Sequence, residues 1–399
     1  MTAGAVLHEV YQRDRARMLA ALIRALGDFE LAEDALQDAC ALALAKWGDP
    51  PPDDPVAWLL TAARNSAIDR LRRARVGREK LAGLGPPETV TVMTEPGLLA
   101  VGDERLSLVF ACCHPALAED ARVALTLQAV VGLTAGQIAR MFLVGESTLA
   151  QRLVRAKRKI RDAGIRLRVP AEDVLPERLS GVLAVTYLIF TQGYTAGAEP
   201  LRREAIRLGK LVAALLPDQP EALGLVALLL LHDSRSAARF DPDGDTVLLA
   251  DQDRSRWDAV EIADAVVLLD RALSLGRPGR YQLQAAIAAL HAQAPSAERT
   301  DWPGIAGLYG QLLAVDPSPV VALNHAVAVA MATTPGEGLA LIDRITGLDR
   351  YHLMHAARAD LLRRLDRPTE AATAYRRAHE LAVSPADRRF LAGRLRELG

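Results

Sequence analysis

The sequence predicts an all-α protein, and three observations support that prediction. Half of its 399 residues are hydrophobic, which is enough to bury the cores of two or three domains. Apolar residues recur every three or four positions along most of the chain, whereas the alternation typical of β-strands is scarce. Prolines and glycines gather between these periodic segments. A chain with this pattern folds as helices packed on helices.

The first predicted module covers residues 5–75 and has helices on both sides of a proline-rich loop. Two or three helices are expected within residues 5–47. The prolines of residues 48–55 end them, and a new helix runs from about Val56 to Arg75. Each helix beside the loop has an apolar stripe on its inner side. These stripes are Leu31, Ala35, Ala39, Ala43 and Trp47 before the loop, and Val56, Leu60, Ala63, Ala67 and Leu71 after it.

Charge is distributed unevenly along the chain, although the formal net charge is only −1. Residues 28–54 are acidic, whereas residues 64–80 and 152–168 are basic. A net charge near zero argues by itself against a nucleic-acid-binding protein. Local runs of one sign matter more than the average, and the two basic runs provide surfaces that suit phosphates.

Cysteine content and hydropathy predict a protein of the reducing cytoplasm. The three cysteines, Cys40, Cys112 and Cys113, form no CxxC motif. The first residues lack the apolar segment of a signal peptide. The longest apolar stretch, residues 223–231, is much shorter than the roughly 20 residues that a membrane span needs, so we expect no membrane partner.

A second helical module is predicted over residues 104–168, after a linker at residues 76–103 that is rich in glycine and proline. Residues 134–160 within it form a predicted helix-turn-helix. Thr134 and Gln137 have the spacing of a capping box at the start of its first helix. The second helix has short polar groups near its start and cations further along, as a helix that reads base edges needs. Its outer face carries Ser147, Gln151, Arg155 and Arg158, flanked by Arg152 and Lys159. An amphipathic helix with a solvated basic face is the alternative interpretation.

Taken together, these segments resemble the sigma-70 family, in particular its extracytoplasmic-function (ECF) group. Residues 32–38 (AEDALQD) followed by Trp47 look like region 2.2 of that family, and residues 58–73 look like regions 2.3 and 2.4. Residues 125–157 look like region 4. The motifs occur in the order and spacing of the family across about residues 5–165, without room for regions 1.1 or 3.

The resemblance implies core RNA polymerase and promoter DNA as partners, and it assigns residues to each. Polymerase is expected to contact Glu33, Asp34, Gln37 and Asp38. The −10 element is expected to contact Asp53, Asp54, Trp58, Asn65, Asp69, Arg72 and Arg73. The −35 element is expected to contact Ser147, Gln151, Arg152, Arg155, Arg158 and Lys159. Trp58 is the one aromatic residue between Trp47 and Phe110, which fits a mode in which a flipped base enters a loop pocket.

The remaining residues, 177–399, are predicted to form an all-helical extension that resembles tetratricopeptide repeats, entered through a hinge at residues 169–176. The clearest repeat is residues 351–385, where Ala359, Ala371, Tyr375 and Ala378 have the small–small–aromatic–small spacing of a packed helix pair. Weaker units are expected at residues 320–346 and from Pro220 onward. Four segments, at residues 223–225, 251–258, 281–287 and 300–302, resemble the long extension of one ECF subgroup. That resemblance implies regulation in cis. A stack of helix pairs also makes a concave surface, so we expect a protein or peptide partner on the repeats.

Two alternatives concern the extension. Asp251, Asp253 and Asp258, with His232 and Asp233, are candidate ligands of a metal cluster, but the arginines among residues 251–258 favour an internal ion-pair network instead. We therefore expect no metal, no cofactor and no catalytic residues, so the protein is not predicted to be an enzyme. The alternative function is a helix-turn-helix transcriptional activator with a ligand- or protein-sensing repeat domain. Such an activator would leave residues 28–75 without a role.

Overall fold

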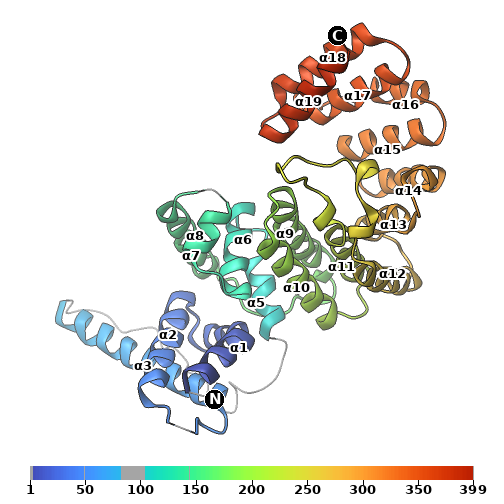
Figure 1. Cartoon of the computed structure of the whole chain (residues 1–399). Helices are drawn as coiled ribbons and strands as arrows, with labels where there is room; N and C mark the ends of the chain where they lie inside the picture. Colours follow the sequence, from blue (N-terminus) through green and yellow to red (C-terminus); the bar gives the residue numbers. More distant parts are fainter. Residues whose placement is uncertain (1–2, 49, 82–103, 143, 399) are drawn as a thin grey trace. The chain divides into compact units, whose positions relative to one another are not determined.

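The computed structural model describes residues 3–48, 50–81, 104–142 and 144–398, and its regular elements there are helices (Figure 1). The predicted all-α class is confirmed. The chain divides into two compact units. The first contains Met1–Gly193 and Arg203–Leu208, and the second contains Tyr194–Arg202 and Gly209–Gly399. Most of the predicted linker, at residues 82–103, lies outside the described residues.

Three helices form the N-terminal module: α1 (Ala3–Leu26), α2 (Phe29–Lys46) and α3 (Pro55–Leu81). Gly27 turns the chain between the first two with a φ of +69°, a conformation that glycine adopts without strain. Asp28 then caps α2 by accepting a hydrogen bond from the Leu31 amide at 2.9 Å. Both predicted stripes face inward, and their central alanines and Leu60 are fully buried.

Helix α3 continues past its predicted end at Arg75 into residues that the sequence assigned to the linker. A single glycine inside a helix costs only about 1 kcal/mol, so Gly77 does not end it.

The second module contains α5 (Glu104–Cys112), α6 (Glu119–Thr126), the π-helical turn η1 (Leu127–Val131), α7 (Ala135–Met141) and α8 (Glu146–Asp162). The predicted capping box is present. The Thr134 amide donates to Gln137 Oε1 at 2.8 Å, and the Gln137 amide donates to Thr134 Oγ1 at 3.2 Å. The inner stripe of α8 is buried as predicted, at Leu149, Leu153, Ala156 and Ile160.

Helix α9 (Leu175–Thr195) belongs mostly to the first compact unit, although the sequence assigned residues from 177 onward to the extension. The Arg178 guanidinium donates to the Phe110 carbonyl oxygen at 2.8 Å. A Cβ atom at Gly181 would lie 3.6 Å from the Cys113 carbonyl oxygen, so the two backbones approach closely there. The first turns of α9 therefore cover the second module.

The second unit is an array of helices in which neighbours along the chain pack together (Figure 1). Its α-helices are α10 (Glu199–Leu215), which also contributes residues to the first unit, α11 (Pro220–Asp233), α12 (Ala259–Ser274), α13 (Arg280–Gln293), α14 (Trp302–Val315), α15 (Pro319–Ala332), α16 (Pro335–Ile342), α17 (His352–Arg364), α18 (Pro368–Leu381) and α19 (Pro385–Glu397). Short 3-10 turns η2 (Ser236–Ala238), η3 (Leu249–Asp251), η4 (Arg254–Arg256) and η5 (Ala297–Arg299) lie between them.

The predicted repeat at residues 351–385 is the helix pair α17–α18. Ala359, Ala371 and Ala378 are fully buried at its centre and Tyr375 is 2% exposed, as the spacing predicted. The weaker unit at residues 320–346 is the pair α15–α16. Glycine is needed there because a Cβ atom at Gly338 would lie 2.3 Å from the Cβ of Ala330.

The side chains of residues 251–258 do not form the ion-pair network that the sequence predicted. Asp253 and Asp258 cap helical turns, and Asp258 Oδ1 accepts from the Val260 and Glu261 amides at 3.0 Å each. Arg254 donates to the carbonyl oxygens of His291 and Ala294, both at 2.9 Å. The carboxylates of Asp253 and Asp258 accept hydrogen bonds from backbone amides two or three residues later. These bonds satisfy both carboxylates without a partner cation.

Neither a metal cluster nor a membrane helix is found in the described ranges. No group of three or more His, Cys, Asp or Glu side chains among those residues could hold a metal ion. No helix among them is long and apolar enough to cross a bilayer.

Candidate nucleic-acid interface

The outer face of α8, the second helix of the helix-turn-helix, is exposed. Ser147, Gln151, Arg155, Arg158 and Lys159 are exposed, opposite the buried stripe that fixes the rotation of the helix. Arg155 donates to the Gln151 carbonyl oxygen at 3.4 Å, and Arg158 pairs with Asp162 at 3.3 Å. Both contacts stay within α8, so a DNA phosphate can replace them without disturbing another helix.

Arg152 differs from the other cations on α8. Its side chain is 28% exposed, and its guanidinium pairs with Asp120 of α6 at 3.3 Å. This ion pair joins the second helix of the helix-turn-helix to the helix behind it. In the structure, Arg152 therefore contacts the protein itself, whereas the sequence grouped it with the DNA-contacting residues.

The exposed side of α3 carries the residues expected at the −10 element. Asn65, Asp69, Arg72 and Arg73 are all exposed along one face. Arg73 Nε donates to the Asp69 carbonyl oxygen at 3.2 Å, which leaves the guanidinium at the helix surface. Two cations and an amide on adjacent turns provide donors for a nucleic-acid backbone.

The loop before α3 is tied to that helix. Asp54 Oδ1 accepts from the Ala57 amide at 3.0 Å, whereas Asp53 is exposed. Trp58 is half-buried, and its ring meets that of Trp47 edge to face, with centroids 5.5 Å apart. Asp54 therefore caps the first turn of α3, and its contact with DNA stays a prediction. Asp49 of the same loop lies outside the described residues.

The acidic residues of α2 do not form one free surface. Asp34 and Gln37 are exposed, but Asp38 accepts hydrogen bonds from Ser66 Oγ at 2.5 Å and Arg70 Nε at 2.9 Å. Arg70 also pairs with Asp34 at 2.6 Å. The bond from Ser66, followed by those from Arg70, lowers the pKa of the Asp38 carboxyl. The contacts join α2 to α3 and hold both acidic side chains in place.

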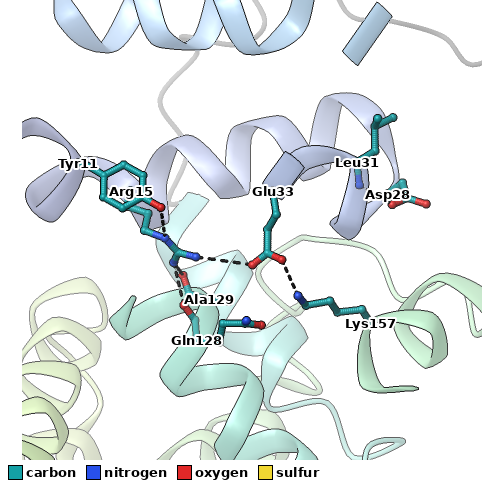
Figure 2. A network of polar contacts seen from close by, with 8 residues as sticks. All are labelled: Tyr11, Arg15, Asp28, Leu31, Glu33, Gln128, Ala129 and Lys157. Atoms are coloured by element: carbon teal, nitrogen blue, oxygen red, sulfur yellow. Dashed lines mark hydrogen bonds and ion pairs between the residues drawn. The ribbon is translucent and has the colours of Figure 1, made fainter. Parts of the chain in front are cut away.

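Glu33 is the acidic residue most engaged with the rest of the chain (Figure 2). Its carboxylate accepts a hydrogen bond from Lys157 Nζ of α8 at 2.5 Å and lies 3.6 Å from the guanidinium of Arg15. Arg15 in turn donates to the carbonyl oxygens of Gln128 and Ala129 in η1, at 2.8 and 2.9 Å. These contacts connect the two modules of the first unit.

Sequence reasoning missed this network, although one signal for it was present. Lys157 follows Leu153 and Ala156 on the inner side of α8, and it is 8% exposed. A lysine on a buried stripe needs a partner carboxylate, because an unpaired buried charge is very costly. The partner is 124 residues away and no local pattern identifies it.

Three family models match the chain. They are Sigma-70 region 2 at residues 7–76, Sigma-70 region 4 at residues 107–160, and a family of unknown function, DUF6596, at residues 178–273. The first two matches cover the modules that carry the surfaces described above. The third covers α9 to α12.

Several curated proteins are similar to the chain. The uncharacterized protein R00370 of Rhizobium meliloti (strain 1021) is 43% identical over 390 residues, which covers 94% of this chain and 92% of that protein. The ECF RNA polymerase sigma factor SigK of Mycobacterium sp. (strain KMS) is 30% identical over 151 residues, or 36% of this chain and 75% of SigK. SigK of Mycobacterium tuberculosis (strain ATCC 25618 / H37Rv) is 27% identical over 164 residues, or 40% and 85%.

Among solved structures, the chain is similar to the crystal structure of the P58(IPK) TPR domain. The two share 14% identity with a TM-score of 0.26, over 92% of this chain and 98% of the other.

Proposed function

The chain belongs to the ECF family of RNA polymerase sigma factors, and we propose that it directs core polymerase to promoters by contacting their −10 and −35 elements. Region 2, the module of α1 to α3, would bind polymerase and the −10 element. Region 4, the module of α5 to α8, would bind the −35 element. The observation that carries this proposal is the exposed polar and basic row along α8, held outward by a fully buried stripe.

At the −35 element, α8 would lie in the major groove. Ser147 and Gln151, on its first turns, are short polar side chains that suit base edges, and Arg155 can donate two parallel hydrogen bonds to a guanine. Arg158 and Lys159, further along, would meet phosphates. A helix that inserts its N-terminal half and rests its C-terminal half on the backbone is the usual docking geometry of a helix-turn-helix.

At the −10 element, the exposed face of α3 would hold the upstream strand while the loop before it receives an extruded base. The upstream strand keeps its phosphate charges when it leaves the duplex, and Arg72 and Arg73 would pair with them. Trp58, on the first turn of α3 after the loop, is half-buried and meets Trp47 edge to face. A base that leaves the stack is stabilised by such a ring.

Core polymerase would meet the outer side of α2. Asp34 and Gln37 are its exposed polar residues, and Asp38 lies beside them, held by α3. Carboxylates at fixed positions suit a basic helical surface, because little side-chain entropy is lost on binding. Glu33 would join this surface once it is released from Lys157.

The C-terminal extension would regulate the factor in cis. Arrays of helix pairs make extended surfaces that bind peptides or partner helices, and the pairs α15–α16 and α17–α18 have the tight small-residue seams of such arrays. The ligand of that surface would be a protein segment, either from this chain or from a partner.

Capture of the full-length protein by core polymerase, followed by transcription from a promoter library, tests the proposal. Wild-type protein should bind core and start transcription at promoters that share −10 and −35 sequences. Asp34→Arg should weaken core binding without unfolding the chain. Glu9→Arg is the control, because Glu9 is an exposed carboxylate on α1 rather than on α2. DNA binding without any core binding would instead favour a helix-turn-helix activator.

A further inference from the structure

The strongest feature that this function does not explain is the polar network between regions 2 and 4 (Figure 2). We propose that Glu33, Lys157 and Arg15 form a latch that holds the two regions together in the free protein and competes with core polymerase. The inference rests on the proposed function, because the latch acts on the same face of α2. The latch would regulate the access of core polymerase to α2.

The latch is built from charges that are largely withdrawn from water. The Lys157 and Glu33 side chains are 9% and 14% exposed, and Arg15 is 14% exposed. Lys157 Nζ also lies 5.5 Å from the ring centroid of Phe29, within reach of a cation–π contact. A lysine and a carboxylate at this depth stabilise the closed state only as a pair.

Arg15 gives the latch a second, independent attachment. Its two hydrogen bonds go to main-chain carbonyl oxygens of η1, the π-helical turn that ends α6. Carbonyl groups near the end of a helix lack intrahelical donors, and a guanidinium satisfies them well. A third contact joins Arg161 at the end of α8 to Asp28 at the start of α2, at 3.2 Å. Region 2 is therefore fastened to region 4 through the first two turns of its acidic helix, at Asp28 and at Glu33.

The closed state and polymerase binding use the same side chain. Glu33 lies next to Asp34 on α2, and both oxygens of its carboxylate are already occupied, one by Lys157 and one by Arg15, so a cation of polymerase would have to displace one of them. Because the charges become hydrated when the regions part, opening costs much less than burying either charge alone. A basic surface on polymerase that pairs with α2 would replace Lys157 and open the latch.

Promoter geometry requires the same opening. At 3.4 Å per base along a strand, elements centred about 25 bases apart are separated by roughly 85 Å of straight duplex. In the closed unit, α2 and α8 are in direct contact through Glu33 and Lys157.

Energy transfer in the full-length protein tests the latch, with dyes on unnatural amino acids at the exposed positions 8 and 163. Lys157→Glu should lower the transfer efficiency of the free protein. The exchange Glu33→Lys with Lys157→Glu should restore part of it, because the pair is rebuilt with reversed charges although the cation at position 33 then faces Arg15. Arg140→Glu is the control, since Arg140 is an exposed cation on α7 outside the network. Saturating core polymerase should lower the transfer in the wild-type protein.

Core affinity supplies the second arm of the experiment. Lys157→Glu alone should raise the affinity for core roughly 3- to 10-fold, because binding no longer has to open the latch. Unchanged transfer in Lys157→Glu, no restoration in the exchange variant, or unchanged core affinity would each overturn the proposal. If no variant and not even wild type binds core, the proposed function fails, whereas the transfer of the free protein still decides whether the latch exists.

Discussion

Arg152 of α8 forms an ion pair with Asp120 of α6 at 3.3 Å, and this contact with another helix distinguishes Arg152 from the neighbouring cations of α8. Arg155 and Arg158 contact only their own helix among the described residues. Arg152 is therefore oriented by the protein, while the other two are oriented toward solvent. Cations that are adjacent in sequence thus have different roles, and the first prediction follows from this difference.

Substitutions along α8 should divide into three classes. Gln151→Ala or Arg155→Ala should cost about 1–3 kcal/mol of promoter binding and relax the preference at one base pair of the −35 element. Lys159→Ala should weaken binding to all promoter sequences alike and reduce the salt dependence of that binding. Arg152→Ala should lower thermal stability by no more than about 1 kcal/mol and keep the preference. Promoter selection and footprinting with the holoenzyme measure all three. An unaltered −35 preference in Gln151→Ala and Arg155→Ala would contradict the assignment.

The double substitution Arg72→Ala/Arg73→Ala should impair strand opening. Both side chains are exposed on α3, so their removal leaves the core of region 2 intact and deletes two phosphate contacts. Permanganate footprinting of the open complex should show fewer reactive thymines at the −10 element. The pair Arg13→Ala/Arg17→Ala, on exposed positions of α1, is the control. Full melting by the Arg72/Arg73 variant would count against this role for α3.

Removal of the extension should depend on where the chain is cut. A protein that ends at residue 168 loses α9, including the bond from Arg178 to the Phe110 carbonyl oxygen and the close packing of Gly181. We expect this protein to expose the surface of region 4 that α9 covers, to aggregate more readily and to support less transcription. A protein that ends at residue 215 retains α9 and the residues of α10 that belong to the first unit. Equal solubility and output from the two truncations would refute this prediction.

Acid should destabilise the second unit through His232. Burial, and then the neighbouring Arg235, lower the pKa of His232 from 6.5 to about 3. The unfolded chain takes up a proton near pH 6.5 and the folded chain does not, so stability is full above pH 6.5 and falls as the pH drops toward 3. At pH 5 the expected loss is about 2 kcal/mol.

Urea unfolding at pH 7.5 and pH 5, followed by circular dichroism, measures this loss. His232→Gln should flatten the dependence, whereas His8→Gln, at an exposed position of α1, should preserve it. His291, whose pKa burial lowers to about 4, acts in the same direction, so a residual slope is expected in His232→Gln. An unchanged slope in that variant would show that His232 is not the group responsible.

Two glycines of α16 give a matched test of the repeat seam. Gly338→Ala should destabilise the second unit by about 1–3 kcal/mol, because the new Cβ would lie 2.3 Å from the Cβ of Ala330 and 2.7 Å from the Ala326 carbonyl oxygen. Gly336→Ala, with nothing within 4 Å of its Cβ, should be neutral or stabilising by up to about 1 kcal/mol. Thermal unfolding compares the two. A Gly338→Ala protein as stable as wild type would show that α15 and α16 pack more loosely than this.

The local order of this protein could be predicted from its sequence. The inner stripe of α8, the capping box of Thr134 and Gln137, and the buried small residues of α17–α18 all follow from the 3.6-residue period and from contacts within a few residues. The exposed candidates on α3 and α8 follow from the same period, since a buried stripe determines which residues face outward.

Only the tertiary structure decided which charges meet. Glu33 was expected to be free for polymerase, but Lys157, 124 residues later, pairs with it. Arg15 bonds to carbonyl oxygens more than a hundred residues away, and Arg178 joins α9 to region 4. Ion pairs and main-chain acceptors are selected when whole helix faces dock, and a charged side chain has the same local pattern whichever partner it finds. The period of a helix is a property of neighbouring residues, whereas the partner of a buried charge is a property of the packed fold.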